Sequence, residues 1–130
     1  MNTLRLTPGS SADTTRKLSV LVGEDVTLSC RFDKLSTLVE WSVLTIEWNK
    51  VDKHAGKSIV YTFEDETAHG SRDGSVVDRT KLLESDASLQ LRNVTVRDEG
   101  LYTCRIITPV VYTETASLEV LGIPLPVSTL

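Results

Sequence analysis

The chain has 130 residues, of which 40% are hydrophobic and 25% are charged, a composition typical of one folded globular domain. Its formal net charge of −4 argues against a nucleic-acid-binding surface, which would need clustered positive charge. No apolar run approaches the roughly 20 residues of a membrane-spanning helix, so no segment of this sequence is expected to span a bilayer.

Residues 1–17 are rich in Ser and Thr, and we expect them to form a flexible leader. Short segments that alternate apolar and polar residues follow, which is the period of a strand with one buried face. The clearest of these are VTLSCRF at 26–32, LTIEWNK at 44–50, KSIVYTF at 57–63, ASLQLRNV at 87–94, LYTCRII at 101–107 and ASLEVL at 116–121. Turn residues separate them, so the pattern predicts an all-β fold, an antiparallel sandwich or barrel.

The last stretch, GIPLPVSTL at 122–130, contains two prolines and has no alternation of apolar and polar residues. This composition is typical of an extended linker, and we expect it to lead toward a following domain. The folded domain is therefore expected to span residues 18–121.

Cys30 and Cys104 lie on the inward faces of an early and a late strand. Neither belongs to a CxxC pair, so their spacing supports neither a redox motif nor a zinc site. Trp48 lies between them on another inward position, and Tyr102 precedes Cys104 by two residues. Composition alone leaves a disulfide and free thiols open, but a reactive thiol needs an electropositive, partly exposed setting that apolar inward faces do not provide.

This order of Cys, Trp and Tyr-x-Cys resembles the signature of the immunoglobulin fold. The resemblance implies a disulfide between Cys30 and Cys104 that joins two sheets and packs on Trp48, with Tyr102 forming a tyrosine corner. It also implies an oxidising compartment, since such disulfides are rare in the cytosol. The distance from Trp48 to Cys104 leaves room for extra strands, so we expect a V-type β-sandwich of two antiparallel sheets with Greek-key topology.

Within that fold, the chain is similar to the V domains of butyrophilin-like proteins and T-cell costimulatory ligands. The matching pieces are LVGEDVTLSC, TIEWNK, IVYTFEDE, DRTKLL, ASLQLRNVTVRDEGLYTC and TASLEV. The last strand reads TETASLEV and lacks the Phe-Gly-x-Gly motif of rearranging antigen receptors. The resemblance implies an extracellular, cell-surface domain that binds a protein receptor on lymphocytes and modulates immune activation. A homophilic adhesion module, seen as a weak homodimer, and an immune-receptor V domain are the alternatives.

The resemblance also implies that the partner binds the sheet face made by the strands conventionally named C, C′, F and G. By alternation, that face carries Glu47, Asn49, Arg105, Ile107, Val111 and Thr113, and Tyr61 is added to it. Apolar side chains around an exposed arginine fit the composition of protein interfaces. Scattered apolar surface of the ordinary kind is the alternative.

The acidic pair Asp98 and Glu99 raises the question of acid–base chemistry. However, Asp98 is the first residue of the stretch Asp-x-Gly-x-Tyr-x-Cys, which belongs to the same immunoglobulin signature. The resemblance implies that this aspartate forms a structural salt bridge with Arg79. Catalysis would need a second perturbed group and a cleft, and none is apparent. We therefore expect no enzyme, no cofactor and no small-molecule substrate.

Three further features lie in predicted turns and loops. The sequence NVT at 93–95 is an N-glycosylation acceptor, and we expect Asn93 to carry a glycan away from the partner face. Trp41 is expected to fold back over the core, with an exposed anchor as the alternative. His54 and His69 have no suitably spaced ligands near them, so no metal site is expected.

Overall fold

The computed structural model describes residues 16–32, 43–107 and 111–122. The strands in these ranges are β1 (Arg16–Leu21), β2 (Val26–Leu28), β3 (Thr45–Val51), β4 (Lys57–Glu64), β5 (Thr67–Gly70), β6 (Ser75–Val77), β7 (Leu89–Leu91), β8 (Gly100–Ile107) and β9 (Val111–Leu121). A short helix, α2 (Arg79–Leu82), follows β6, and a 3-10 turn, η2 (Val96–Asp98), precedes β8. Over the same ranges, no helix has the length and apolar character needed to cross a bilayer.

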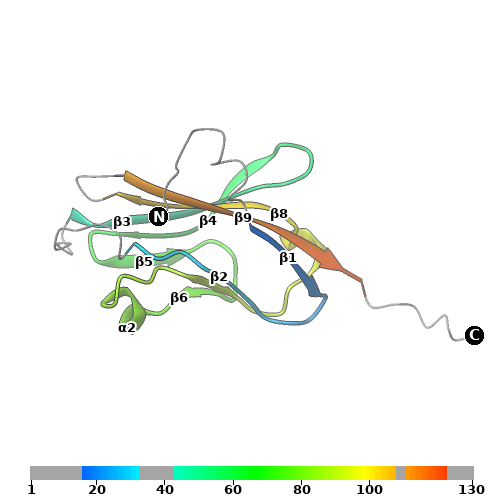
Figure 1. Cartoon of the computed structure of the whole chain (residues 1–130), viewed down its shortest axis with the longest axis horizontal. Coiled ribbons are helices and arrows are strands. Elements are labelled where there is room, and N and C mark those ends of the chain that lie inside the picture. Colours follow the sequence, from blue (N-terminus) through cyan, green and yellow to red (C-terminus); the bar gives the residue numbers. More distant parts are fainter. Residues whose placement is uncertain (1–15, 33–42, 108–110, 123–130) are drawn as a thin grey trace, which may run out of the picture.

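The strands form two sheets that enclose the core (Figure 1). The larger sheet has the order β1-β9-β8-β3-β4-β5, and the smaller has the order β2-β7-β6. Neighbouring strands are antiparallel except for β1 and β9, which run parallel. The expected all-β sandwich is therefore confirmed, with one parallel pair at an edge. Because β1 begins at Arg16, residues 16 and 17 belong to the sheet and not to the leader.

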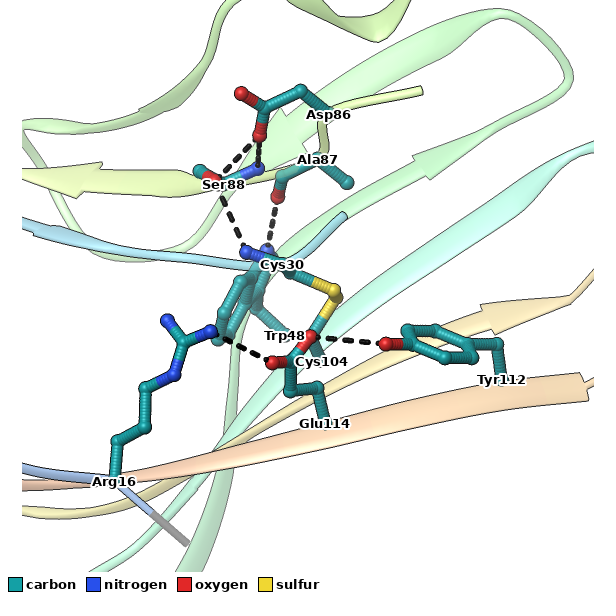
Figure 2. The surroundings of a disulfide bond; sticks show 9 residues. All are labelled: Arg16, Cys30, Trp48, Asp86, Ala87, Ser88, Cys104, Tyr112 and Glu114. Atoms are coloured by element: carbon teal, nitrogen blue, oxygen red, sulfur yellow. Dashed lines mark hydrogen bonds and ion pairs between the residues drawn. A yellow bond between two sulfur atoms is a disulfide. The ribbon is translucent and has the colours of Figure 1, made fainter. Parts of the chain in front are cut away.

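The inward faces of both sheets meet in an apolar core. Cys30 of the smaller-sheet side and Cys104 of β8 form the expected disulfide, which lies beside Trp48 (Figure 2). Trp48 is 1% exposed, and its Nε1 donates a hydrogen bond to the carbonyl of Ala87 at 3.0 Å. The indole is thus buried without an unpaired polar group, which would be costly. The backbone N–H of Cys30 donates to Ser88 Oγ at 3.0 Å.

Side chains add to the backbone pairing of β1 with β9. The guanidinium of Arg16 forms an ion pair with Glu114 at 3.1 Å, and the hydroxyl of Tyr112 donates to the same carboxylate at 3.2 Å (Figure 2). Further along, Ser19 Oγ donates to Glu119 at 3.2 Å. The first and last described strands are therefore held together by both backbone and side chains.

Candidate protein-recognition face

The residues just before β8 form a tightly bonded corner. The hydroxyl of Tyr102 donates to the backbone carbonyl of Asp98 at 2.5 Å, which is the geometry of a tyrosine corner. Burial of Tyr102, together with the nearby negative charge of Asp98, raises the pKa of the phenol above its ordinary value. Tyr102 therefore stays protonated and acts as a structural hydrogen-bond donor.

Asp98 is paired with Arg72, and the predicted pairing with Arg79 is wrong. Arg72 Nε lies 2.7 Å from Asp98 Oδ1 and Arg72 Nη2 lies 2.8 Å from Oδ2, so the contact is bidentate. Burial acts to raise the pKa of Asp98, but hydrogen bonds from Arg72 and the Thr95 N–H, with the charges of Arg72 and Lys50, outweigh it. The net result is a lowered pKa, so the carboxylate remains ionised.

Arg79 lies elsewhere because of where the chain turns. It is the first residue of α2, after Asp78 caps the helix, and its guanidinium carbon lies 5.6 Å from the centre of the Phe63 ring. Arg72 precedes β6 in a turn that Gly74 makes with φ of +81°, and this turn brings Arg72 up to η2. Arg72 also donates to the carbonyl of Arg92 at 2.9 Å, which joins this turn to the end of β7.

The Arg72–Asp98 ion pair has a structural role. The charged residues predicted to bind a partner lie instead on the outward face of β9, β8, β3 and β4. The strand register places Thr113 beside Arg105, Arg105 beside Glu47, and Glu47 beside Thr62. Arg105 is exposed and forms no ion pair within the described part of the chain. A cation and an anion thus lie side by side in the middle of this face.

Apolar side chains border this charged row. Val111 is 51% exposed and lies opposite the half-buried Ile107 in the register of β8 and β9. On the other side, Ile59 of β4 is 48% exposed. We call Glu47, Arg105, Ile107, Val111, Thr113 and Ile59 the recognition face. An exposed arginine among apolar groups is the composition that protein interfaces favour.

Asn49 was predicted to be exposed on this face, and that prediction is wrong. Its register position faces outward, between Thr103 and Ile59, but the residue is only 7% exposed. Its Nδ2 donates to Glu47 Oε1 at 3.1 Å, which fixes the position of that carboxylate. Its Oδ1 is buried with no hydrogen-bond partner among the residues that the structure describes. Asn49 therefore supports the recognition face from below its surface.

Tyr61 was also placed on the outward face, and the structure contradicts this as well. The register of β3 and β4 shifts between Trp48, which pairs with Tyr61, and Asn49, which pairs with Ile59. Val60 is the extra residue of this bulge, and both Val60 and Tyr61 are buried, at 5% and 4% exposed. The bulge turns Tyr61 inward, so Ile59 takes the surface position.

The other candidates lie in turns, on the edge strand β5 beside this face, or outside the described residues. Asn93 is exposed in the turn after β7, and His54 is exposed in the β3–β4 turn, where its N–H donates to Asp52. His69 lies on β5, opposite Thr62. No group of three or more His, Cys, Asp or Glu residues is gathered for a metal ion within 16–32, 43–107 and 111–122. Trp41 lies outside the described residues.

Comparison with known proteins agrees with this geometry. The family model of the immunoglobulin V-set domain matches residues 13–121. The chain belongs to the immunoglobulin V-set family. The V-type fold expected from the Cys, Trp and Tyr signature is therefore confirmed, and the match begins a few residues before β1.

The relatives are larger proteins, and the chain matches only part of each. The chain is 34% identical over 95 residues to the tapasin-related protein of Mus musculus, covering 72% of this chain and 20% of that protein. It is 30% identical over 111 residues to cell adhesion molecule 2 of Xenopus tropicalis, covering 85% and 22%. The chain thus spans about a fifth of the length of these relatives. Its fold matches the V-like domain of human B7-H4 with a TM-score of 0.66 and 26% identity, covering 85% and 96%.

Proposed function

We propose that this V-set domain is an extracellular protein-recognition module, not an enzyme, and that its recognition face binds a protein receptor on lymphocytes and modulates their activation. The observation that carries the proposal is Arg105, an exposed cation without an ion-pair partner in the described chain, set among Glu47, Ile107 and Val111. The lymphocyte receptor follows from the resemblance to costimulatory ligands. The disulfide supports an extracellular location, because an oxidising compartment favours it.

The arrangement fits binding to another protein surface better than binding to a small molecule. Long β-strands make the face broad, and Arg105 can form charge-assisted hydrogen bonds with a partner carboxylate. The exposed Val111 and Ile59 can lose their contact with water on binding. Arginine side chains of this kind often carry a large share of interface energy.

Replacing Arg105 with Glu is expected to weaken receptor binding by at least about 30-fold, because it removes a central cation and places like charges on neighbouring strands. The free energy of unfolding should change by no more than about 1 kcal/mol, since the residue is exposed. Binding of an Fc fusion to receptor-expressing lymphocytes, measured by flow cytometry, checks the first expectation. Thermal unfolding checks the second.

The matched control is Lys81→Glu, which makes the same charge change on an exposed residue of α2 in the described structure. This control variant should bind like the wild type. If Arg105→Glu retains binding while both variants are folded, the recognition face is not the site, and the stretch of sequence around Trp41 becomes the next segment to mutate.

A second candidate function, homophilic adhesion, is favoured by one specific observation. Glu47 and Arg105 are opposite charges at adjacent register positions on one face, so the face is complementary to itself. In a two-fold dimer, Arg105 of each copy would meet Glu47 of the other. The similarity to cell adhesion molecule 2 also supports this candidate.

A charge-swap series tests the homophilic dimer by sedimentation equilibrium at high protein concentration. Each single variant, Glu47→Arg or Arg105→Glu, should self-associate at least about 10-fold more weakly, because both contacts of the dimer become repulsive. An equimolar mixture of the two single variants should associate again, because every contact then joins opposite charges. A wild type that stays monomeric, or a mixture that does not associate, contradicts the homophilic dimer and leaves the receptor proposal standing.

A further inference from the structure

Asn93 lies in a turn that backbone hydrogen bonds hold in place. Its own N–H donates to Asp25 Oδ1 at 3.0 Å. The N–H of the next residue, Val94, donates to the carbonyl of Glu24 at 2.9 Å, and the carbonyl of Val94 accepts from Gly23 at 2.7 Å. Asn93 has φ of +52°, a left-handed conformation that asparagine tolerates better than most residues do. Three hydrogen bonds therefore join this turn to the turn before β2.

The two residues that follow are engaged as well. Val94 is completely buried, and Thr95 caps η2 by accepting a hydrogen bond from the Arg97 N–H at 3.3 Å. The N–H of Thr95 donates to Asp98 Oδ2 at 2.8 Å, which closes a capping box. The side-chain amide of Asn93 contrasts with these groups: it is exposed and has no hydrogen-bond partner within the described chain. A group attached to it would project into solvent without disturbing these contacts.

We propose that Asn93 carries an N-linked oligosaccharide. The stretch Asn93-Val94-Thr95 is the acceptor sequence Asn-x-Thr, and none of the other asparagines in the chain begins such a sequence. The donor is an oligosaccharide carried on a lipid pyrophosphate. The Asn93 amide nitrogen forms a bond to the anomeric carbon of the sugar and gives up one proton, while the bond from that carbon to the pyrophosphate oxygen breaks and the lipid pyrophosphate leaves.

The disulfide supports this modification independently of the acceptor sequence. A bond between Cys30 and Cys104 forms in an oxidising compartment such as the lumen of the secretory route. A chain that acquires its disulfide there meets the glycosylation machinery of the same lumen. The acceptor sequence and the disulfide thus both indicate passage through the lumen of the secretory route.

The position of Asn93 leaves the recognition face uncovered. The turn of Asn93 packs on residues 23–25, and the adjacent Val22 N–H donates to the carbonyl of Leu121, the last residue of β9, at 3.0 Å. Asn93 therefore lies at the end of the sandwich where β9 finishes, and a glycan on it would project from that end. Arg105 pairs with Thr113, close to the start of β9 and therefore toward the opposite end of the larger sheet. A glycan on Asn93 and a protein on the recognition face can be present together.

The test is secretion of the domain from glycosylating animal cells, followed by intact mass measurement before and after treatment with peptide N-glycosidase. The wild type should lose one glycan mass, and digestion in ¹⁸O-water should label Asn93 as it becomes aspartate. Asn93→Gln should be secreted without sugar. Thr95→Asn should also lack sugar at Asn93, because it destroys the acceptor sequence. Its asparagine still supplies a side-chain oxygen that can cap η2. Thr95→Ser should keep both the cap and the sugar.

Two results would overturn the proposal. One is a wild type that is secreted with its disulfide formed but with Asn93 unmodified. The other is a Thr95→Asn variant that keeps the glycan mass of the wild type, because that sugar would then lie on a residue other than Asn93. If Asn93→Gln is poorly secreted because glutamine fits the left-handed turn badly, Thr95→Asn decides the question. None of these outcomes depends on partner binding, so they test the glycan separately from the proposed function.

Discussion

Replacing both cysteines with alanine is expected to lower the free energy of unfolding by at least about 4.5 kcal/mol, the chain-entropy value for a loop of this length. The disulfide closes a loop with a sequence separation of 74, so its loss gives the unfolded chain much more freedom. Cys30 and Cys104 are also fully buried. Removing their sulfur atoms leaves a cavity beside Trp48, which lowers stability further. Urea denaturation of the oxidised wild type and the double variant measures the difference.

Reduction of the wild type measures the loop-closure contribution alone, because both sulfurs stay in place and no cavity forms. If the double variant does not fold, the urea midpoint of the reduced wild type supplies the comparison. A loss of less than about 1 kcal/mol by both routes would contradict the assigned role of the disulfide, because the loop-closure contribution alone exceeds that value.

Replacing Arg72 with Met is expected to lower the free energy of unfolding by about 3 kcal/mol, because it leaves the Asp98 carboxylate buried without its cation. The side chains of Arg72 and Asp98 are 20% and 9% exposed, so water cannot fully replace the lost partner. The same change releases the carbonyl of Arg92 from its hydrogen bond. Urea denaturation at neutral pH, where Asp98 is ionised, is the measurement.

Arg79→Met is the matched control, since Arg79 is exposed and its guanidinium lies over the Phe63 ring and not against Asp98. A cation–π contact at an exposed site contributes about 0.5–1 kcal/mol, so this variant should lose far less stability. An Arg79→Met variant that loses as much as Arg72→Met would reinstate the pairing expected from family resemblance.

The fold and its core could be predicted because they depend on a few strong local signals. Alternation of apolar and polar residues identifies strands, since side chains in a strand point to opposite faces in turn. Cys30, Trp48, Tyr102 and Cys104 occupy inward positions of those strands, and the structure buries all of them. The same alternation places Arg105 on the outside, where the structure has it exposed.

Alternation fails where the pleat itself is interrupted. In β4, the bulge at Val60 makes two consecutive residues point toward buried surroundings, so Tyr61 reverses its face. Nothing in the stretch Ile59-Val60-Tyr61 marks the extra residue, because all three are typical strand residues. Alternation also predicts which face of the sheet a side chain points to, but not how deeply that side chain is buried. For this reason the outward-facing Asn49 could not be recognised as buried.

The salt-bridge partner of Asp98 could not be predicted from the sequence for a different reason. Arg72 and Arg79 are both arginines on the same stretch of chain, on either side of β6. Which of them reaches Asp98 depends on the turn at Gly74 and on the helix that starts at Arg79. These are properties of the folded backbone, so a motif that names only the residue type cannot distinguish the two.

The parallel pairing of β1 with β9 determines how the domain would bear mechanical tension. In a parallel pair, the start of β1 and the end of β9 lie at opposite ends of the ladder. A pull applied at Arg16 and Leu121 therefore slides the two strands past each other and loads all their hydrogen bonds at once, in shear, instead of opening them one after another. Should the pair yield, the covalent link between Cys30 and Cys104 keeps the chain between them from lengthening. Only the segments outside that loop can extend, so the sheet centre that holds Glu47 would keep its shape under load.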